Sequence, residues 1–489
     1  MNQYSSIFLI FTLILAETVS AQFILTAPDR VRTPLNVEMK QIGTITPRST
    51  KDIESSRLTV GCETIDRDHV VWDHYKDYLP PLGVKKIRLQ AGWAKCEKVP
   101  GVYDWVWLDE IIDFAVAHNI EPWLQTSYGN PAYPGGGGVN LLNSMMTSEE
   151  GWAAWDRWVE ALVARYKDRV QEWEIWNEPD HPGQNITPET TAHLNIRTAE
   201  IIKRIQPEAK IAGLAYTSNS DKVYLDRFLE IIAEAGKLDL FDWISYHSYT
   251  MRPEDAYTEN RVLGLRSVLE KYSKDILLRQ GENGAPSTYI PSFALSEYYW
   301  TEYTQAKYNM RRMLGDLGHD IETSVFTIID IYYNWGERAV LNTKGLIQSD
   351  ITMAAIRPKV AYYAIQNLAA IFDDEMVLNP GFKYTSTNTE SLSVYRFQHQ
   401  PTKTPLAALW LDGKNATNSF ETTQVNITFE NISLKTPVWV DLMTGSIHEI
   451  PKSQWSKSGN SCTFSIPLYD SPVLITEQSF IIRKPSEAN

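Results

Sequence analysis

The feature that most constrains the fold is a repeated alternation of short β-rich runs and amphipathic helical segments, which begins near Leu58. Such an alternation is typical of βα units that build a parallel sheet. Eight strand candidates lie in this part of the chain, at residues 57–61, 86–89, 121–125, 172–176, 210–214, 242–247, 276–279 and 324–329. Eight strands with helices between them predict an α/β fold of the (β/α)8 type, a TIM barrel.

Helix signals lie between the strand candidates. Residues 108–116 carry apolar side chains at the spacing of a single buried helix face, and Asn119 follows where a left-handed cap is expected. The pattern Thr147-x-x-Glu150 predicts a capping box at the start of a second helix. Thr187 and Pro188 predict the start of a third, because proline is favoured at the first helical position.

The pattern changes near residue 357. A helix at 360–372 is assigned to the barrel, and six short runs after it predict strands at 391–395, 406–411, 425–429, 438–442, 462–466 and 473–476. We therefore divide the chain into a barrel at residues 57–372 and an antiparallel β-sandwich at residues 373–489. Residues 23–56 are an N-terminal β segment that either adds strands to the sandwich or covers the floor of the barrel.

The first 22 residues, 1–22, are predicted to be a cleaved signal peptide. Residues 7–16 are an apolar run, and Val19-Ser20-Ala21 forms a small-x-small cleavage signature. The run is much shorter than the ~20 residues needed to span a bilayer. We expect a secreted or periplasmic protein without a membrane span.

Charge and cysteine content exclude some classes of function. The net charge of −14 argues against nucleic acid or an anionic membrane as a partner, since both require a basic surface. Cys62, Cys96 and Cys462 are too few for a disulfide scaffold and match no zinc pattern. Cys62 and Cys96 either pair or are buried free thiols. The 16 tryptophans and 25 tyrosines suit a sugar-binding cleft and an aromatic core equally well.

The strongest local motif is Trp176-Asn177-Glu178-Pro179, at the end of the fourth strand candidate. Pro179 lacks an N–H donor and therefore ends the strand. Asn177 and Glu178 then lie at the carboxyl end of the strand, where barrels of this type build their active sites. An ordinary strand end with a solvated glutamate is the alternative, and the four-residue motif in this position argues against it.

A second glutamate, Glu282, follows the seventh strand candidate within Gly281-Glu282-Asn283-Gly284. We expect the two glycines to let the backbone turn tightly and to leave the carboxylate accessible. The motif alone also fits an exposed turn. Its position argues for a role in catalysis, because strands four and seven of an eight-stranded barrel face each other across its mouth.

Two facing carboxyl groups are what glycoside hydrolysis requires. When they lie ~5–5.5 Å apart, one attacks the anomeric carbon while the other protonates the leaving oxygen, and the sugar keeps its configuration. The attacking carboxylate has to stay ionised. The positions of Glu178 and Glu282 therefore predict a retaining glycoside hydrolase.

The two motifs resemble the catalytic pair of clan A glycoside hydrolases, whose glutamates end barrel strands four and seven. By this resemblance Glu178 is the acid/base, Glu282 is the nucleophile, and Asn177 hydrogen-bonds the sugar 2-hydroxyl. The Trp-Asn-Glu-Pro form and the C-terminal sandwich are most similar to family 39, which includes β-xylosidases and α-L-iduronidases. The resemblance covers roughly residues 57–372, in which the two glutamate motifs are the specific part.

Other strand ends supply further candidates. His247 and Tyr249 end strand six beside Glu282, where clan A enzymes place a histidine or an aromatic residue that holds the nucleophile. A packed core histidine is the alternative. Arg88 on strand two resembles a clan residue whose charge keeps Glu282 ionised, and a structural ion pair is the alternative.

Four residues are candidates for the wall of the cleft. Trp335, after strand eight, is predicted to be a platform for a sugar ring. Trp93, Gln125 and Tyr128 are predicted to line the same cleft. We expect an oligo- or polysaccharide substrate there, with no metal and no cofactor.

The predicted function is a metal-free, exo-acting, β-xylosidase-like retaining β-glycosidase for a plant- or algal-type glycan. An endo-acting glycanase or a transglycosylase of the same clan is the alternative among enzymes. A carbohydrate-binding protein that keeps the barrel without turnover is the alternative outside them. The sequence carries no signature for the sugar, because specificity depends on loop side chains that contact single hydroxyl groups.

Overall fold

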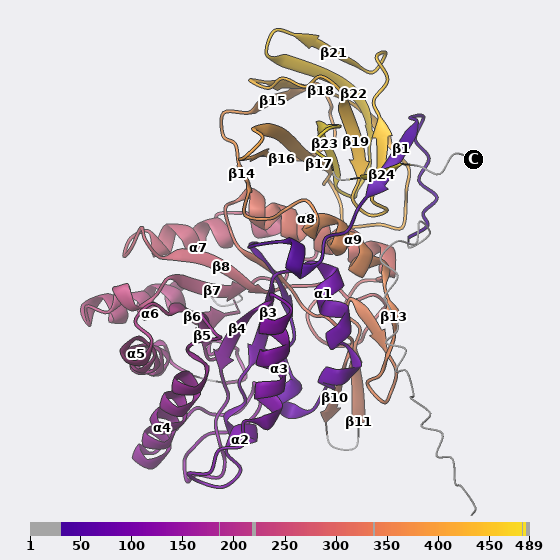
Figure 1. Ribbon diagram of the computed structural model, residues 1–489. Helices are drawn as coiled ribbons and strands as arrows, with labels where there is room; N and C mark the ends of the chain where they lie inside the picture. The colour runs from indigo at the N-terminus through magenta and orange to yellow at the C-terminus, as the bar shows by residue number, and fades with distance from the viewer. Residues whose placement is uncertain (1–30, 185, 218–221, 336–337, 482, 486–489) are drawn as a thin grey trace, which may run out of the picture.

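The computed structural model describes residues 31–184, 186–217, 222–335, 338–481 and 483–485 (Figure 1). The predicted signal peptide, residues 1–22, lies outside the described residues. Among the residues that are described, no helix combines the length and the apolar character needed to cross a bilayer. In Figure 1 a sheet surrounded by helices forms the lower body, and the strands of the C-terminal region stand above it.

The lower body is a parallel barrel whose strands follow the order of the chain. Its eight strands are β2 (Leu58–Gly61), β3 (Lys86–Gln90), β4 (Glu121–Thr126), β5 (Glu172–Ile175), β6 (Lys210–Tyr216), β7 (Trp243–His247), β8 (Leu277–Glu282) and β9 (Thr323–Val325). β9 pairs with β2 and bridges to β8, which brings the two ends of the sheet together. All eight predicted strands are present. The eighth is shorter than predicted, because after Val325 the N–H groups of Thr327 and Asp330 donate to Lys344 and Ile347, and only the Ile328 N–H still donates to Gly61 of β2.

Helices cover the outside of the barrel. They are α3 (Val106–Ala117), α4 (Glu149–Tyr166), α5 (Pro188–Ile205), α6 (Lys222–Glu234), α7 (Val262–Leu269), α8 (Glu302–Gly318) and α9 (Val360–Ala369). Two predicted helix ends are confirmed: Asn119 follows α3 at a φ of 56°, and the Thr187 hydroxyl caps α5. The predicted capping box at Thr147 is wrong by one residue, because the Ser148 hydroxyl accepts the N–H of Gly151 and caps α4.

Shorter elements lie before, between and after the barrel strands. The short helices are α1 (Leu79–Leu82) and α2 (Trp93–Cys96), and single 3-10 turns lie at Thr50–Asp52, Ile65–Arg67, Trp72–His74, Lys76–Tyr78, Leu238–Leu240 and Pro253–Ala256. Two hairpins follow the eighth barrel strand, formed by β10 (Ile331–Trp335) with β11 (Arg338–Asn342) and by β12 (Ile347–Ser349) with β13 (Ala355–Pro358). The first hairpin leads directly into the wall of the candidate active site.

The C-terminal region forms two antiparallel sheets. The larger sheet has the order β14 (Met376–Leu378), β16 (Leu392–His399), β17 (Thr404–Leu411), β23 (Val473–Glu477), β19 (Pro437–Asp441), β20 (Ser446–Glu449), β1 (Gln41–Ile45) and β24 (Arg483–Pro485). The smaller sheet has the order β15 (Lys383–Ser386), β18 (Thr423–Glu430), β22 (Ser461–Leu468) and β21 (Trp455–Ser458). All six predicted strands are present. β1 pairs with β20 and β24, so the N-terminal β segment contributes a strand to the sandwich.

Buried ion pairs tie the sandwich to α8 of the barrel. Lys307 on α8 lies 2.5 Å from Asp470 of the sandwich, and both side chains are almost fully buried. Arg311, on the next turn of α8, pairs with Glu254, which also accepts a hydrogen bond from the indole N–H of Trp410. Breaking a buried pair leaves a charge without compensation, which costs several kcal/mol. The two parts of the molecule therefore hold a fixed relation to each other.

Packing accounts for half of the tryptophans. Eight of the 16 have fully buried side chains: Trp93, Trp123, Trp155, Trp158, Trp173, Trp176, Trp410 and Trp439. The aromatic content therefore reflects the core at least as much as a sugar-binding cleft. Cys62, Cys96 and Cys462 are buried and free, which confirms the free-thiol interpretation of the first two.

Candidate active site

Glu178 follows β5 on a strained stretch of backbone. Trp176 and Glu178 adopt positive φ angles of 62° and 48°, a region that residues other than glycine rarely occupy. Main-chain hydrogen bonds hold this turn, since the Trp176 N–H donates to Thr126 and the Glu178 N–H donates to Ala215. Backbone strain that the surroundings enforce is concentrated at functional sites in proteins. The turn after β5 thus carries backbone strain at the glutamate that the sequence predicts to be catalytic.

Glu282 is the last residue of β8, the seventh strand of the barrel. The prediction that the adjacent glycines allow a tight turn is wrong, because neither has a positive φ. A Cβ on Gly281 would lie 2.4 Å from the Ser245 hydroxyl oxygen, and one on Gly284 would lie 2.1 Å from the Phe326 carbonyl oxygen. Glycine is required at both positions because neighbouring chain segments approach closely.

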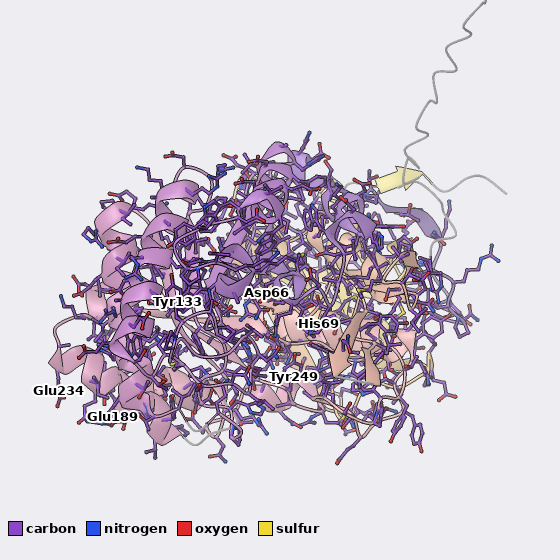
Figure 2. All side chains as sticks on the ribbon, turned by 90° about the horizontal axis from the view of Figure 1, so that it is seen from below. Asp66, His69, Tyr133, Glu189, Glu234 and Tyr249 are labelled. Atoms are coloured by element: carbon purple, nitrogen blue, oxygen red, sulfur yellow. The ribbon has the colours of Figure 1, made fainter. Side chains whose placement is uncertain are left out.

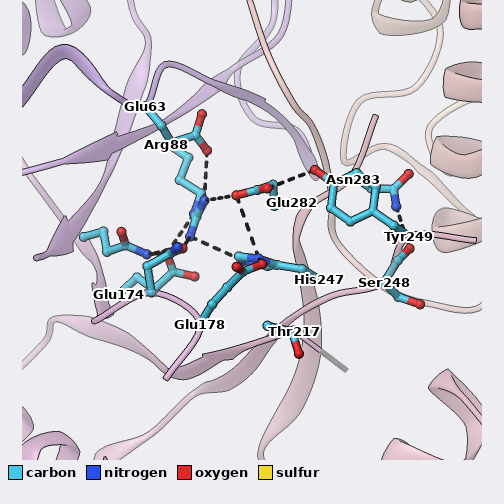
Figure 3. A network of polar contacts seen from close by, with 12 residues as sticks. Glu63, Arg88, Glu174, Glu178, Thr217, His247, Ser248, Tyr249, Glu282 and Asn283 are labelled. Carbon is cyan, nitrogen blue, oxygen red and sulfur yellow. Dashed lines mark hydrogen bonds and ion pairs between the residues drawn. The ribbon is translucent and has the colours of Figure 1, made fainter. Parts of the chain in front are cut away.

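His247 stands between the two glutamates (Figure 3). Its Nδ1 lies 2.8 Å from Oε1 of Glu178 and 3.8 Å from Oε2 of Glu282. One ligand atom from each of the three side chains lies within 4.8 Å of the other two. Burial disfavours a charged imidazole, but the two carboxylates together raise the pKa of His247 above its ordinary value. The carboxyl groups on strands four and seven thus lie side by side, with a histidine that links them.

The neighbours of Glu282 favour its ionised form. Its Oε1 accepts a hydrogen bond of 2.9 Å from the Tyr249 hydroxyl, and its Oε2 lies 3.3 Å from Nη1 of Arg88. Burial acts to raise the pKa of this carboxyl group, but the charges of His247 and Arg88 and the bond from Tyr249 hold it below its ordinary value. Glu282 is therefore a carboxylate at neutral pH.

Arg88, on β3, is fully buried and connects the active-site carboxylates (Figure 3). Its Nε lies 2.7 Å from Glu174, and its Nη1 lies 2.9 Å from Glu63. Its Nη2 donates to Oδ1 of Asn177 at 2.9 Å. Arg88 is thus both a structural ion-pair partner and a direct neighbour of Glu282, so its two interpretations do not exclude each other.

Asn177 is held from two sides. It accepts the bond from Arg88, and its Nδ2 donates to the Tyr128 hydroxyl at 3.0 Å. Asn177 and Tyr128 both line the cavity that contains the two glutamates. The prediction that Gln125 lines the same cleft is wrong, because Gln125 is fully buried outside the cavity wall and donates to Glu174 at 2.6 Å.

The two tryptophans predicted for the cleft have different outcomes. Trp93 reaches the cavity wall, but its side chain is fully buried and stacks on Trp158 and Tyr133. Its indole N–H donates to Glu97 at 2.6 Å. The side chain of Trp93 therefore packs behind the cavity wall and is not a surface on which a sugar ring can stack. The side chain of Trp335 lies outside the described residues, so its predicted role as a platform stays a prediction.

The cavity has a volume of about 1240 Å³. In the view of Figure 2, its wall residues Asp66, His69 and Tyr249 lie together in the middle of the visible face. Loops after several barrel strands form this wall, as expected at the carboxyl end of a barrel. Typical small-ligand pockets have volumes of ~300–1,000 Å³. The cavity therefore has room for more than one sugar residue.

Glu63 and Lys344 are two of the charged cavity residues that the sequence analysis did not predict. Glu63 follows β2 and is 3% exposed, and burial raises its pKa to about 7 although the charge of Arg88 acts in the opposite direction. Lys344 has its Nζ 4.1 Å from the ring centroid of Tyr249, and burial lowers its pKa to about 7 against the charge of Glu282. The sequence did mark Glu63, since it lies two residues after the first strand candidate. No sequence feature marked Lys344 as a cavity residue, because it follows a hairpin that lies outside the barrel sheet.

Replacing Glu63 with glutamine should change how stability depends on pH. The native pKa of about 7 exceeds the ordinary value of 4.5, so between these values the native protein binds more protons than the unfolded chain. Its free energy of unfolding therefore falls as the pH rises through this interval. Because the glutamine does not titrate, Glu63→Gln should gain roughly 3 kcal/mol of unfolding free energy relative to the wild type across the interval. Urea denaturation followed by tryptophan fluorescence measures the difference.

The exposed Glu297→Gln is the matched control, and its curve should run parallel to that of the wild type at every pH. Parallel curves for Glu63→Gln as well would show that Glu63 does not take up a proton on folding. A buried amide in place of the carboxyl group keeps the size of the side chain, so the comparison isolates its ionisation.

The ligand atoms of Glu178, His247 and Glu282 are close enough together to hold a metal ion. Each of them also has protein partners, however. The His247 Nδ1 is in hydrogen-bond contact with Glu178, and the two oxygens of Glu282 contact Tyr249 and Arg88. Interactions within the protein therefore account for the arrangement of these three side chains.

The chain is similar in sequence to known glycoside hydrolases. The family model "Glycosyl hydrolases family 39" matches residues 82–307, which include Glu178 and Glu282. A β-xylosidase from Geobacillus stearothermophilus is 26% identical over 160 residues, 31% of this chain and 31% of that enzyme. The chain thus aligns with about a third of the length of this curated relative.

Solved structures share the fold. A family 39 glycoside hydrolase from Bacteroides cellulosilyticus WH2 has a TM-score of 0.62 at 17% identity, over 86% of this chain and 81% of that one. A monomeric β-xylosidase from Caulobacter crescentus CB15 has a TM-score of 0.53 at 16% identity, over 90% and 98%. By sequence the chain is similar to glycoside hydrolases of family 39, and it shares the fold of solved structures from that family.

Proposed function

We propose that the protein is an exo-acting, retaining β-glycosidase of the β-xylosidase type that cleaves a plant- or algal-type glycan by double displacement. Glu282 is its nucleophile and Glu178 its acid/base. The observation that carries the proposal is that carboxylate oxygens of the two residues lie within 4.8 Å of each other. Retaining enzymes hold their carboxyl groups ~5–5.5 Å apart, whereas inverting enzymes need ~6.5–9.5 Å to admit a water molecule.

In the first step, Glu282 attacks the anomeric carbon while Glu178 protonates the glycosidic oxygen. A glycosyl ester forms on Glu282, the bond to the leaving oxygen breaks, and the freed alcohol carries the proton. Arg88 and Tyr249 each contact one oxygen of Glu282, so they hold the carboxylate in place for the attack.

In the second step, the ionised Glu178 takes a proton from a water molecule, whose oxygen attacks the same carbon. Glu282 leaves as a carboxylate, and the two successive inversions restore the original configuration. Asn177, which is fixed by Arg88 and Tyr128 at the cavity wall, is the proposed partner of the sugar 2-hydroxyl. His247 contacts Glu178 and keeps it oriented in both steps.

A panel of aryl glycosides tests the proposal. Aryl β-xylosides should be hydrolysed fastest, since β-xylosidases are among the similar proteins. Proton NMR of the first product, before mutarotation, should show the β-anomer. A first product with the α-configuration would rule out double displacement by this pair. Glycan binding without hydrolysis of any member of the panel would instead favour a carbohydrate-binding protein.

The size of the cavity favours an endo-acting glycanase as a second candidate. A volume of about 1240 Å³ has room for sugar residues on both sides of the cleaved bond. The products formed from soluble xylan separate the two candidates. An exo-acting enzyme releases monosaccharide from the start, whereas an endo-acting enzyme first releases a ladder of oligosaccharides.

A further inference from the structure

Two exposed tyrosines stack on each other in the segment between β8 and α8. Tyr289 is 54% exposed and Tyr299 is 83% exposed. Their ring centroids are 5.5 Å apart, and their planes are inclined by 27°. In the part of the chain that the structure describes, the next most exposed tyrosine, phenylalanine or tryptophan is Tyr384, at 37%. The pair therefore stands out in a protein that buries most of its aromatic rings.

The segment that carries the pair is well anchored. Ile290 and Trp300, next to the two tyrosines in sequence, are each only 3% exposed. The indole N–H of Trp300 donates to the Leu295 carbonyl at 2.7 Å, and the Tyr298 hydroxyl donates to the Ala416 carbonyl of the sandwich at 2.7 Å. The backbone on both sides of the exposed rings is thus fixed. A rigid pair of rings can bind a ligand without a large loss of conformational entropy.

The same segment forms part of the catalytic cavity. Phe293 and Ala294, which lie between the two tyrosines in sequence, line its wall. On the other side of Tyr289, the Ser287 N–H donates to the Thr343 carbonyl at 2.9 Å, and the next residue, Lys344, lines the cavity too. The stacked pair therefore lies on a loop that borders the cavity.

The residues around the pair suit an uncharged, hydroxyl-rich ligand. Between residues 283 and 300 the sequence contains several serines and threonines, and its single charged residue is Glu297. Aromatic rings with a hydroxyl group combine an apolar face with a polar edge. A sugar ring matches both features, because its C–H face packs on an aromatic ring while its hydroxyl groups stay in water.

We propose that Tyr289 and Tyr299 form a stacking platform for a neutral glycan chain that extends out of the catalytic cavity. This inference rests on the proposed function, which places a glycosidic bond at Glu178 and Glu282. It adds a binding site outside the cavity that contributes to polymer binding and not to bond cleavage. A glycan chain is the expected occupant because the loop that carries the platform also lines, through Phe293 and Ala294, a cavity that exceeds the size of one sugar.

The test compares the wild type with Y289A/Y299A and with the matched control Y289F/Y299F. Native gels that contain soluble xylan, galactan or laminarin measure the binding of polymers. At least one polymer should retard the wild type and the phenylalanine variant. For the alanine variant the apparent affinity should fall about fivefold or more, which corresponds to the loss of one or two ring contacts. The kcat/KM for an aryl glycoside should stay the same in all three proteins.

Equal retardation of all three proteins, or no retardation by any polymer, would overturn the inference. A wild-type dimer in analytical ultracentrifugation that dissociates in the alanine variant would also overturn the inference, because the rings would then bind a second copy of the chain. The binding assay does not depend on turnover. A protein that is retarded through its tyrosines but hydrolyses nothing would thus contradict the proposed function and leave the platform standing.

Discussion

Replacing Glu282 with alanine should lower the turnover of an aryl β-glycoside by about 10⁴-fold or more, because the glycosyl ester can no longer form. The substitution also leaves a space beside the anomeric carbon. Sodium azide should enter it and restore part of the activity, since the azide ion needs no activation by a base. Attack from the side of the lost carboxylate inverts the configuration once, so a β-glycoside should yield the α-glycosyl azide. NMR of the product identifies this anomer.

Loss of Glu282 also removes one partner of the buried Arg88, so stability has to be measured beside activity. Thermal unfolding of Glu282→Ala should show a folded protein in the assay. Glu297→Ala, an exposed glutamate from the segment after the same strand, is the matched control and should keep wild-type turnover. If Glu282→Ala turned over an aryl β-glycoside at the wild-type rate, the assignment of the nucleophile would be wrong.

Replacing Glu178 with alanine should have an effect that depends on the leaving group. Substrates with a poor leaving group need its proton and should lose about 10²–10⁴-fold in kcat/KM. A dinitrophenyl glycoside needs no protonation and should form the glycosyl ester at close to the normal rate. The intermediate should then accumulate, because no base activates water. A burst of dinitrophenol in stopped-flow measurements reports this step.

Azide distinguishes the two glutamates from each other. In Glu178→Ala it should attack the glycosyl ester on Glu282, which is the second of two inversions, and so yield the β-glycosyl azide. In Glu282→Ala it should yield the α-anomer. The same anomer from both variants would contradict the assignment of separate roles. Opposite anomers would establish the acid/base and the nucleophile in one pair of experiments.

The barrel and the positions of the two glutamates could be predicted because their signals are local. Each strand and helix has its own hydrophobic period, and Asn177 and Glu178 are marked by the proline that ends their strand. The error at Thr147 has a local cause too, since Thr147 and Ser148 are both suitable cap residues and only the path of the chain selects between them.

The rest of the site depends on contacts between distant segments. Because side chains alternate along a strand, Gln125 is expected to point into the barrel as a cleft residue would. Its amide does point inward, but it donates to Glu174 on the next strand inside the barrel. Lys344 reaches the cavity only because the hairpin of β10 and β11 leads back to it. The partner of β1 lies in the sandwich, beyond the whole barrel in sequence. No pattern within a short window of sequence contains this information.

The pairing of β1 with β20 and β24 has a consequence for the order of folding. A chain emerges from the ribosome with its N-terminus first, so residues 41–45 are made long before their partners at 446–448 and 483–485. The barrel can form in that interval, because its strands pair in the order in which they are made. The large sheet is completed only after residues 483–485 have been made, because β1 pairs with β24 there. β1 and β24 thus pair only after the barrel strands that lie between them in sequence have been synthesised.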